Sequence, residues 1–275
     1  MSSKISKRET TFNIPSNRSL WSKLGKYDAL VEYQEVATQL MLRSYNPSKE
    51  SFRDFLKRIS APIGIHLNGI TLQHFKEIQY QGYLVFPNAS FDDFLTGFSA
   101  DVRILIYDQF DESKIDGCRF EKILDSLNNI GIKPVIEESK VKLYHYYRLL
   151  RNDIAHQLNK DYSIEYKQID INTIGNFYPN LSKPHSKDSL DFNDFILCTA
   201  NVKDIADKMT QSLLPHIDWK RLCVVNREKW FPRYKNFIAE KNDRRLRGYI
   251  RTSLFCCYGI KFTESYLDQI IGSLE

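Results

Sequence analysis

The side chains best suited to chemistry in this chain are an arginine and a histidine five positions apart. Arg151 is followed by Asn152 and by a short run that ends at His156. A guanidinium stabilises the charge that builds up on phosphate oxygens during phosphoryl transfer. An imidazole is the side chain best able to move a proton near neutral pH. Together these groups can cleave RNA without a metal ion, with the ribose 2′-hydroxyl as nucleophile.

The segment from Arg151 to His156 resembles the Arg-x4-6-His signature of HEPN domains, the helical ribonucleases of toxin–antitoxin, abortive-infection and CRISPR-associated systems. In that family the residue after the arginine is usually Asn, Asp or His, and Asn152 fits. The resemblance covers the motif and its flanking helices, about residues 90–215. It implies an endoribonuclease in which two protomers place their motifs at one shared cleft. It also implies a setting in antiviral defence or growth arrest, with an antitoxin or defence-system protein as partner.

A helix over residues 142–160 would separate apolar from polar side chains. One face would carry an apolar core stripe of Leu143, Tyr147, Leu150, Ile154 and Leu158. The opposite face would carry a polar line of His145, Arg148, Asn152 and His156, which suits a cleft wall or a dimer seam. On an ideal helix Arg151 lies about 140° from His156. A helix end near the motif or a second subunit must therefore bring these two together, and we expect a homodimer.

The same residues also allow a purely structural interpretation. An arginine near a helix C-terminus interacts favourably with the helix dipole, and a histidine there can cap carbonyl groups. A non-catalytic RNA-binding or scaffold protein of the same fold is therefore the second hypothesis. The two hypotheses differ at His156, because only the nuclease needs its imidazole. In either case we expect His145 and Arg148 to contact RNA or the dimer seam.

Composition narrows the class of protein. The chain has 275 residues, of which 42% are hydrophobic and 27% charged, as expected for a globular protein. It has no apolar run of membrane-spanning length and no signal-peptide pattern near its start, which favours a cytoplasmic protein without a membrane partner. Its 5 cysteines lack metal-ligand spacing, and His66 and His74 have no carboxylate pair nearby. We therefore expect no metal and no other cofactor.

Positive charge is concentrated near the C-terminus. Residues 217–275 hold 12 Lys/Arg and 7 Asp/Glu, a net charge of +5 that equals the formal charge of the whole chain. Within residues 217–251, where 11 Lys/Arg stand against 4 Asp/Glu, lie six aromatic residues: Trp219, Trp230, Phe231, Tyr234, Phe237 and Tyr249. Basic and aromatic side chains together suit a single-stranded RNA, with Arg244, Arg245 and Arg247 as its contacts. The alternatives are a solvated helix over core aromatics, or a helical regulator whose tail binds DNA.

The periodicity of apolar residues predicts a mostly α chain. Helices are expected over residues 19–44, 52–59 with Ser48 as N-cap, 88–111, 118–129, 142–160 and 191–214, followed by two or three more that end with 263–274. Residues 78–86 favour a short strand, with a loop as the alternative, and the long connection 161–189 includes a second strand over 162–169. The resemblance implies that four of these helices form an antiparallel HEPN-like bundle. We expect a flexible segment over 1–17, the bundle over 18–216 with an insertion at 60–87, and a basic helical extension over 217–275.

Overall fold

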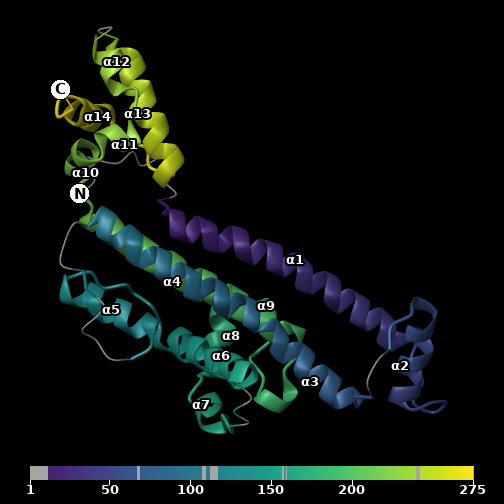
Figure 1. The fold of residues 1–275 in the computed structure, drawn as a ribbon. Coiled ribbons are helices and arrows are strands. Elements are labelled where there is room, and N and C mark those ends of the chain that lie inside the picture. The colour runs from purple at the N-terminus through teal and green to yellow at the C-terminus, as the bar shows by residue number, and fades with distance from the viewer. Residues whose placement is uncertain are drawn as a thin grey trace. The chain divides into compact units, whose positions relative to one another are not determined.

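The described part of the chain is mostly helical. The computed structural model describes residues 12–66, 69–106, 110–111, 117–156, 158, 160–239 and 242–274. It is 76% helix and contains no strand among these residues, which confirms the mostly α class (Figure 1). The HEPN-like arrangement of the helices stays a prediction. Within the described residues, no helix combines the length and the apolar character needed to span a membrane.

Two compact units make up the chain. Unit 1 takes the residues up to Leu20, Asp92–Val135 and Ala206–Glu275, and unit 2 takes Trp21–Phe91 and Ile136–Ile205. The Arg151–His156 motif belongs to unit 2, and the basic C-terminal region belongs to unit 1. The domain boundaries expected at residues 17 and 216 stay predictions. In the N-terminal segment, Phe12 and Ile14 are buried, whereas residues 1–11 lie outside the described part.

Unit 2 is built around helix α6, against which α3, α7 and α8 pack. Its elements, three of which also contribute residues to unit 1, are α1 (Pro15–Arg43), α2 (Phe52–Ser60), η1 (Ala61–Ile63), α3 (Leu72–Tyr83), α4 (Val85–Leu105), α6 (Glu138–His156), α7 (Ser163–Lys167), α8 (Ile171–Phe177), η2 (Lys187–Ser189) and α9 (Phe192–Leu213). The core of the unit is rich in tyrosine: Tyr80, Tyr83, Tyr146, Tyr147 and Tyr162 are all buried in one cluster. Figure 1 shows α7 and α8 beside α6.

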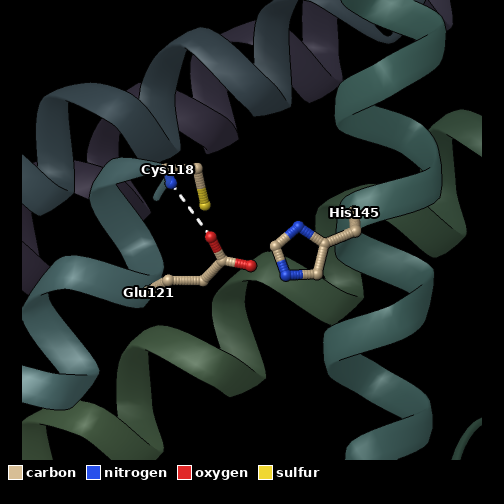
Figure 2. Close-up of side chains that lie close together, drawn as sticks. All are labelled: Cys118, Glu121 and His145. Atoms are coloured by element: carbon tan, nitrogen blue, oxygen red, sulfur yellow. Dashed lines mark hydrogen bonds between the residues drawn. The ribbon is translucent and has the colours of Figure 1, made fainter. Parts of the chain in front are cut away.

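Unit 1 adds α5 (Arg119–Asn129) and the C-terminal elements η3 (Leu214–His216), α10 (Trp219–Val225), α11 (Arg227–Trp230), α12 (Tyr234–Ala239), α13 (Asp243–Tyr258) and α14 (Glu264–Ile271). Helix α13 packs against α12 and α14, and α10 packs against α11 and α14. Helix α5 begins where the Cys118 backbone N–H donates to the Glu121 carboxylate at 2.9 Å (Figure 2). Such a bond satisfies one of the donors that a helix start leaves free.

Both expected strands are wrong, because these segments are helical. Most of residues 78–86 lies in α3 and at the start of α4, and residues 163–167 form α7. Tyr80, Tyr83 and Leu84 stand three and four residues apart, so a helix brings all three to one side. There they join the core cluster that contains α6 residues. Burial against α6 thus outweighs the β propensity of the aromatic and β-branched side chains.

Helix boundaries differ from expectation at several ends. Helix α2 is capped by Ser51, whose hydroxyl accepts from the Asp54 N–H at 3.2 Å, and not by Ser48. Helix α6 starts and ends four residues earlier than expected, so Leu158 lies beyond it and is exposed. The connection 161–189 contains two α-helices and the short η2, and the described residues of the C-terminal region form five α-helices where two or three helices were expected. Most of the additional helices are short and have little periodicity of their own. Their bounds are therefore hard to predict from the spacing of apolar residues.

Two glycines of unit 2 provide a test of backbone conformation. An added Cβ would meet no described atom within 4 Å at Gly25, inside α1, or at Gly64, where φ is +69°. We expect Gly25→Ala to raise the free energy of unfolding by about 1 kcal/mol, because glycine is a poor helix former. Gly64→Ala should lower it by about 1 kcal/mol, because alanine resists a left-handed backbone. Chemical denaturation measures both, and the same sign for the two variants would contradict these assignments.

Candidate active site

The Arg151–His156 motif forms the last turn and a half of α6. Arg151 and Asn152 are half-buried, and the Arg151 Nη1 donates to the Asn152 Oδ1 at 2.9 Å. His156 is the final helical residue and is exposed. Because α6 stays helical up to His156, the directions of Arg151 and His156 remain about 140° apart. The helix end therefore does not bring these two groups together within one chain.

The wheel expected for this helix is largely confirmed. Leu143, Tyr147 and Leu150 are buried, and Ile154 is half-buried. On the polar line, His145, Arg148 and Asn152 are half-buried. The Arg148 Nε is buried without a hydrogen-bond partner among the described residues. His145 projects from α6 in Figure 2. This polar line thus offers a cation, a histidine and an amide at partly open positions.

A buried carboxylate that the sequence did not single out anchors the motif. Asp153 is 5% exposed, and its Oδ2 accepts from the Lys187 Nζ at 2.6 Å. Its Oδ1 accepts from the Lys160 N–H at 2.9 Å and from the Tyr162 hydroxyl at 3.4 Å. Burial alone would raise the pKa of Asp153, but these hydrogen bonds and the Lys187 charge hold it below the ordinary value of 3.8. The residue therefore fixes the end of α6 as an ionised group.

Lys187 brings a distant segment to the motif. It lies in η2, 34 residues after Asp153, and its Nζ also donates to the Lys160 carbonyl at 3.0 Å. Two residues earlier, the carbonyl of His185 accepts from the Tyr146 hydroxyl at 3.0 Å. The long connection after the motif thus folds back onto α6. Its return to α6 follows from charge pairing across many residues, which no local pattern signals.

A second polar cluster of unit 2 joins His185 to Asp194. The His185 Nδ1 lies 2.9 Å from the Asp194 Oδ2, and the Asp194 side chain is 1% exposed whereas the imidazole is 35% exposed. Asp194 also accepts from the Tyr147 hydroxyl and the His185 N–H, each at 2.9 Å, and from the Asp191 N–H at 3.0 Å. A carboxylate accepts, so the imidazole donates to Asp194 when it carries its proton on Nδ1. Burial and the Asp194 charge raise the pKa of Tyr147, so its hydroxyl stays a donor.

The same cluster is where unit 2 comes nearest to a metal site. One donor atom each from His185, Asp191 and Asp194 lie within 4.8 Å of one another. A histidine and two carboxylates suit Mn²⁺ or Zn²⁺ in principle. Both oxygens of Asp194 already accept hydrogen bonds, however, and Asp191 accepts from the Asn193 N–H at 2.8 Å at the start of α9. Hydrogen bonding within the protein thus accounts for this cluster without a cation.

The expected RNA contacts in unit 1 fall into two kinds. Arg244 and Arg245 are exposed in the first turn of α13. Arg247 forms ion pairs with Asp268 and with Glu264, the latter at 3.9 Å, so its charge is already matched. Of the aromatic residues, Trp219, Phe231 and Tyr234 are buried, and the core alternative therefore applies to them. The basic region is a packed helical unit that carries exposed arginines.

One hollow of unit 2 lies away from the motif. It measures about 540 Å³ and is lined by α1, α3 and the start of α4, including Thr38, Phe75, Ile78 and Phe86. No residue of the Arg151–His156 motif lines it.

Comparison with known proteins adds no relative. No family model, no curated protein and no solved structure matches this chain. The functional assignment therefore depends on these residues and their geometry.

The Asp153–Lys187 pair leads to a pH-dependent prediction. Asp153→Asn removes the charge with little change of shape and should lower the free energy of unfolding by about 1.5–3 kcal/mol at neutral pH. Because the folded pKa lies below 3.8, this stabilisation is present above that value and is lost as the pH falls through the folded pKa. Urea unfolding of wild type and variant at about pH 7 and about pH 3 measures the change. The exposed Asp188→Asn in the same segment is the control, and an equal effect of both variants would contradict the assignment.

Proposed function

We propose that this protein is a metal-independent endoribonuclease of HEPN type that leaves 2′,3′-cyclic phosphate and 5′-hydroxyl ends. The observation that supports this most is the placement of the motif at an anchored helix end. Asp153 holds the turn, Asn152 holds the Arg151 guanidinium, and His156 stands exposed at the last helical position. Groups that are fixed before the substrate arrives stabilise a transition state without reorganisation.

In the proposed reaction, the imidazole of His156 takes the proton of the ribose 2′-hydroxyl. The 2′-oxygen attacks the adjacent phosphorus, and the bond to the 5′-oxygen breaks. Arg151 neutralises the non-bridging oxygens, whose charge grows in the transition state. Asn152 acts through Arg151, because its amide oxygen accepts from the guanidinium.

The proposal includes a homodimer. Arg151 and His156 point in directions about 140° apart on a continuous helix. A two-fold axis near α6 would place Arg151 of one protomer opposite the His156 of its partner and so build two equal sites. The half-buried polar line of His145 and Arg148 would then lie at the seam or along the RNA. In keeping with the family resemblance, the setting would be antiviral defence or growth arrest.

The motif itself gives the first test. Arg151→Ala and His156→Ala should each reduce cleavage by about 10²-fold or more, as expected for positioned charge and proton-transfer groups. The assay is incubation of purified protein with total cellular RNA in EDTA, followed by mapping of the cut ends. His74→Ala is the matched control, since this exposed histidine lies on α3 and pairs with Glu77. Full cleavage by a folded His156→Ala protein would point to the non-catalytic RNA-binding alternative.

Mixing the two inactive variants tests the shared site. If each site takes Arg151 from one protomer and His156 from the other, a heterodimer of the variants keeps one intact site. Random exchange should then restore roughly a quarter of wild-type activity, because half of the dimers are heterodimers with one of two sites intact. The measurement is cleavage by an equimolar mixture after denaturation and refolding together. Absence of recovery, with dimers present by light scattering, would show that each site lies within one chain.

The exposed arginines of α13 are proposed to bind the RNA backbone. Replacing Arg244 and Arg245 with alanine should weaken RNA affinity and flatten its salt dependence by about 0.7 in the log–log slope for each lost single-strand contact. Turnover at saturating RNA should hardly change, because uniform binding acts on KM. Arg247→Ala is the contrast: its ion pairs with Glu264 and Asp268 predict an effect on stability. Unchanged affinity and slope in the double variant would place the RNA path elsewhere.

A further inference from the structure

The cavity that α1, α3 and the start of α4 enclose in unit 2 has the size of a site for a small molecule. Its volume of about 540 Å³ lies within the range of ligand pockets. The rings of Phe75, Tyr83 and Phe86 form much of its lining, and Thr38 and Gln79 bring polar groups to it. No lysine, arginine or histidine is among the residues that line it. The cavity therefore offers an aromatic surface but no positive charge for an anion.

A hydrogen-bond network fixes the orientation of the amide in the cavity lining. The Gln79 Nε2 donates to the Thr38 hydroxyl at 2.9 Å and to the Tyr83 hydroxyl at 2.5 Å. It also lies 3.5 Å from the Glu35 Oε2. All three oxygens can accept, so the amide nitrogen faces them and the Gln79 Oε1 points away from them. No donor among the described residues bonds to this Oε1, which is left as an acceptor for a ligand.

Glu35 adds a negative charge beside the same network. Its half-buried carboxylate accepts from the Gln39 Nε2 at 2.6 Å and from the Tyr80 hydroxyl at 3.3 Å, and no cation of the described residues forms an ion pair with it. Burial and the Glu35 charge raise the pKa of Tyr83, which lines the cavity. A carboxylate that is partly withdrawn from water is stabilised when a cation approaches. The electrostatics of the cavity therefore favour a positively charged ligand.

Gly82 keeps one side of the cavity free of side-chain atoms. It lies inside α3, and its backbone is not in the left-handed region that favours glycine. An added Cβ would meet no neighbouring atom within 4 Å. Alanine forms helices better than glycine does, so neither the helix nor its packing accounts for a glycine here. The glycine does preserve space in the cavity that it lines.

A purely structural role explains only part of this arrangement. The bond between Gln79 and Thr38 joins α3 to α1, and the Tyr80 hydroxyl needs an acceptor because its ring is buried. A neutral amide oxygen at position 35 would accept the same bonds. Structure alone therefore requires neither the negative charge of Glu35 nor the missing side chain of Gly82.

We propose that this cavity binds a small organic cation, an ammonium group attached to an aromatic body. The body packs against the rings of Phe75 and Phe86, which also attract a cation through their π faces. The ammonium group donates to the Gln79 Oε1 and is attracted by the Glu35 carboxylate. The inference goes beyond the proposed nuclease activity and does not depend on it, because no residue of the Arg151–His156 motif lines the cavity.

Three probes with the same indole ring test the charge of the ligand. They are tryptamine, which is a cation at neutral pH, the neutral tryptophol and the anion indole-3-propionate. Titration calorimetry with the full chain should give saturable binding of tryptamine with a dissociation constant of about 1 mM or lower. Tryptophol should bind about tenfold more weakly, and indole-3-propionate more weakly still. Equal affinities for the three probes, or no saturable binding of tryptamine, would overturn the proposal.

Replacement of the carboxylate tests the source of the selectivity. Glu35→Gln should lower the affinity for tryptamine by about tenfold and leave that for tryptophol unchanged. Unchanged binding of tryptophol shows by itself that the cavity of the variant is intact. Glu32→Gln is the matched control, because Glu32 is exposed on the same helix, and its affinities should equal those of the wild type. An equal loss of tryptamine binding in both variants would show that the protein's overall charge, and not Glu35, selects the cation.

Filling the cavity tests its location. Gly82→Leu should abolish binding of both tryptamine and tryptophol, because the added side chain occupies the space next to α3. Gly25→Leu is the control, since Gly25 has equally open surroundings on α1 but does not line the cavity. Retained tryptamine binding in a folded Gly82→Leu protein would overturn the assignment of the site. Failure of the wild-type protein to cut RNA would remove the proposed function and leave this inference standing.

Discussion

The arrangement of unit 2 depends on the pairing of one buried carboxylate with a lysine. Asp153 has little contact with water, and an ionised carboxylate in such a place is stable only when its oxygens are paired. Lys187 provides the cation from a segment 34 residues further along the chain. The connection after the motif must therefore fold back on α6, and α7 and α8 pack on the same helix as it does so. This charge pair thus holds the long connection against α6, beside the motif.

Tyrosine hydroxyls donate hydrogen bonds to this polar network from within an apolar core. The rings of Tyr146 and Tyr147 are buried among leucine, isoleucine and phenylalanine side chains. Their hydroxyls, in contrast, reach the His185 carbonyl and the Asp194 carboxylate. A phenylalanine would fill the same space but would remove one hydrogen bond from each acceptor, at a cost of about 1–3 kcal/mol for each lost bond. The tyrosine-rich character of α6 is therefore as much a feature of the polar site as of the core.

The sequence predicted those parts of the fold in which one helix has one continuous apolar face. Helices were expected over 88–111 and 191–214, where α4 and α9 lie, and the motif lies on a helix with its polar line less buried than its core face. It did not predict α3, where tyrosines with high β propensity form the buried side of a helix. Nor did it predict the roles of Asp153, Lys187, His185 and Asp194. Their pairing spans up to 34 residues, and a spacing rule reaches only the next helical turns.

The direction of the motif's side chains limits how such a site can work. Arg151 and His156 belong to one rigid helix, so no side-chain rotation changes the angle of about 140° between their Cα–Cβ directions by much. A substrate phosphate that contacts the Arg151 guanidinium therefore meets, from the same chain, groups on the Tyr147 side of α6. In the proposed nuclease, the imidazole of His156 therefore reaches the same phosphate from another copy of the chain. Such a site would combine Arg151 of one protomer with His156 of its partner across a two-fold axis, so that neither protomer alone would complete the reaction.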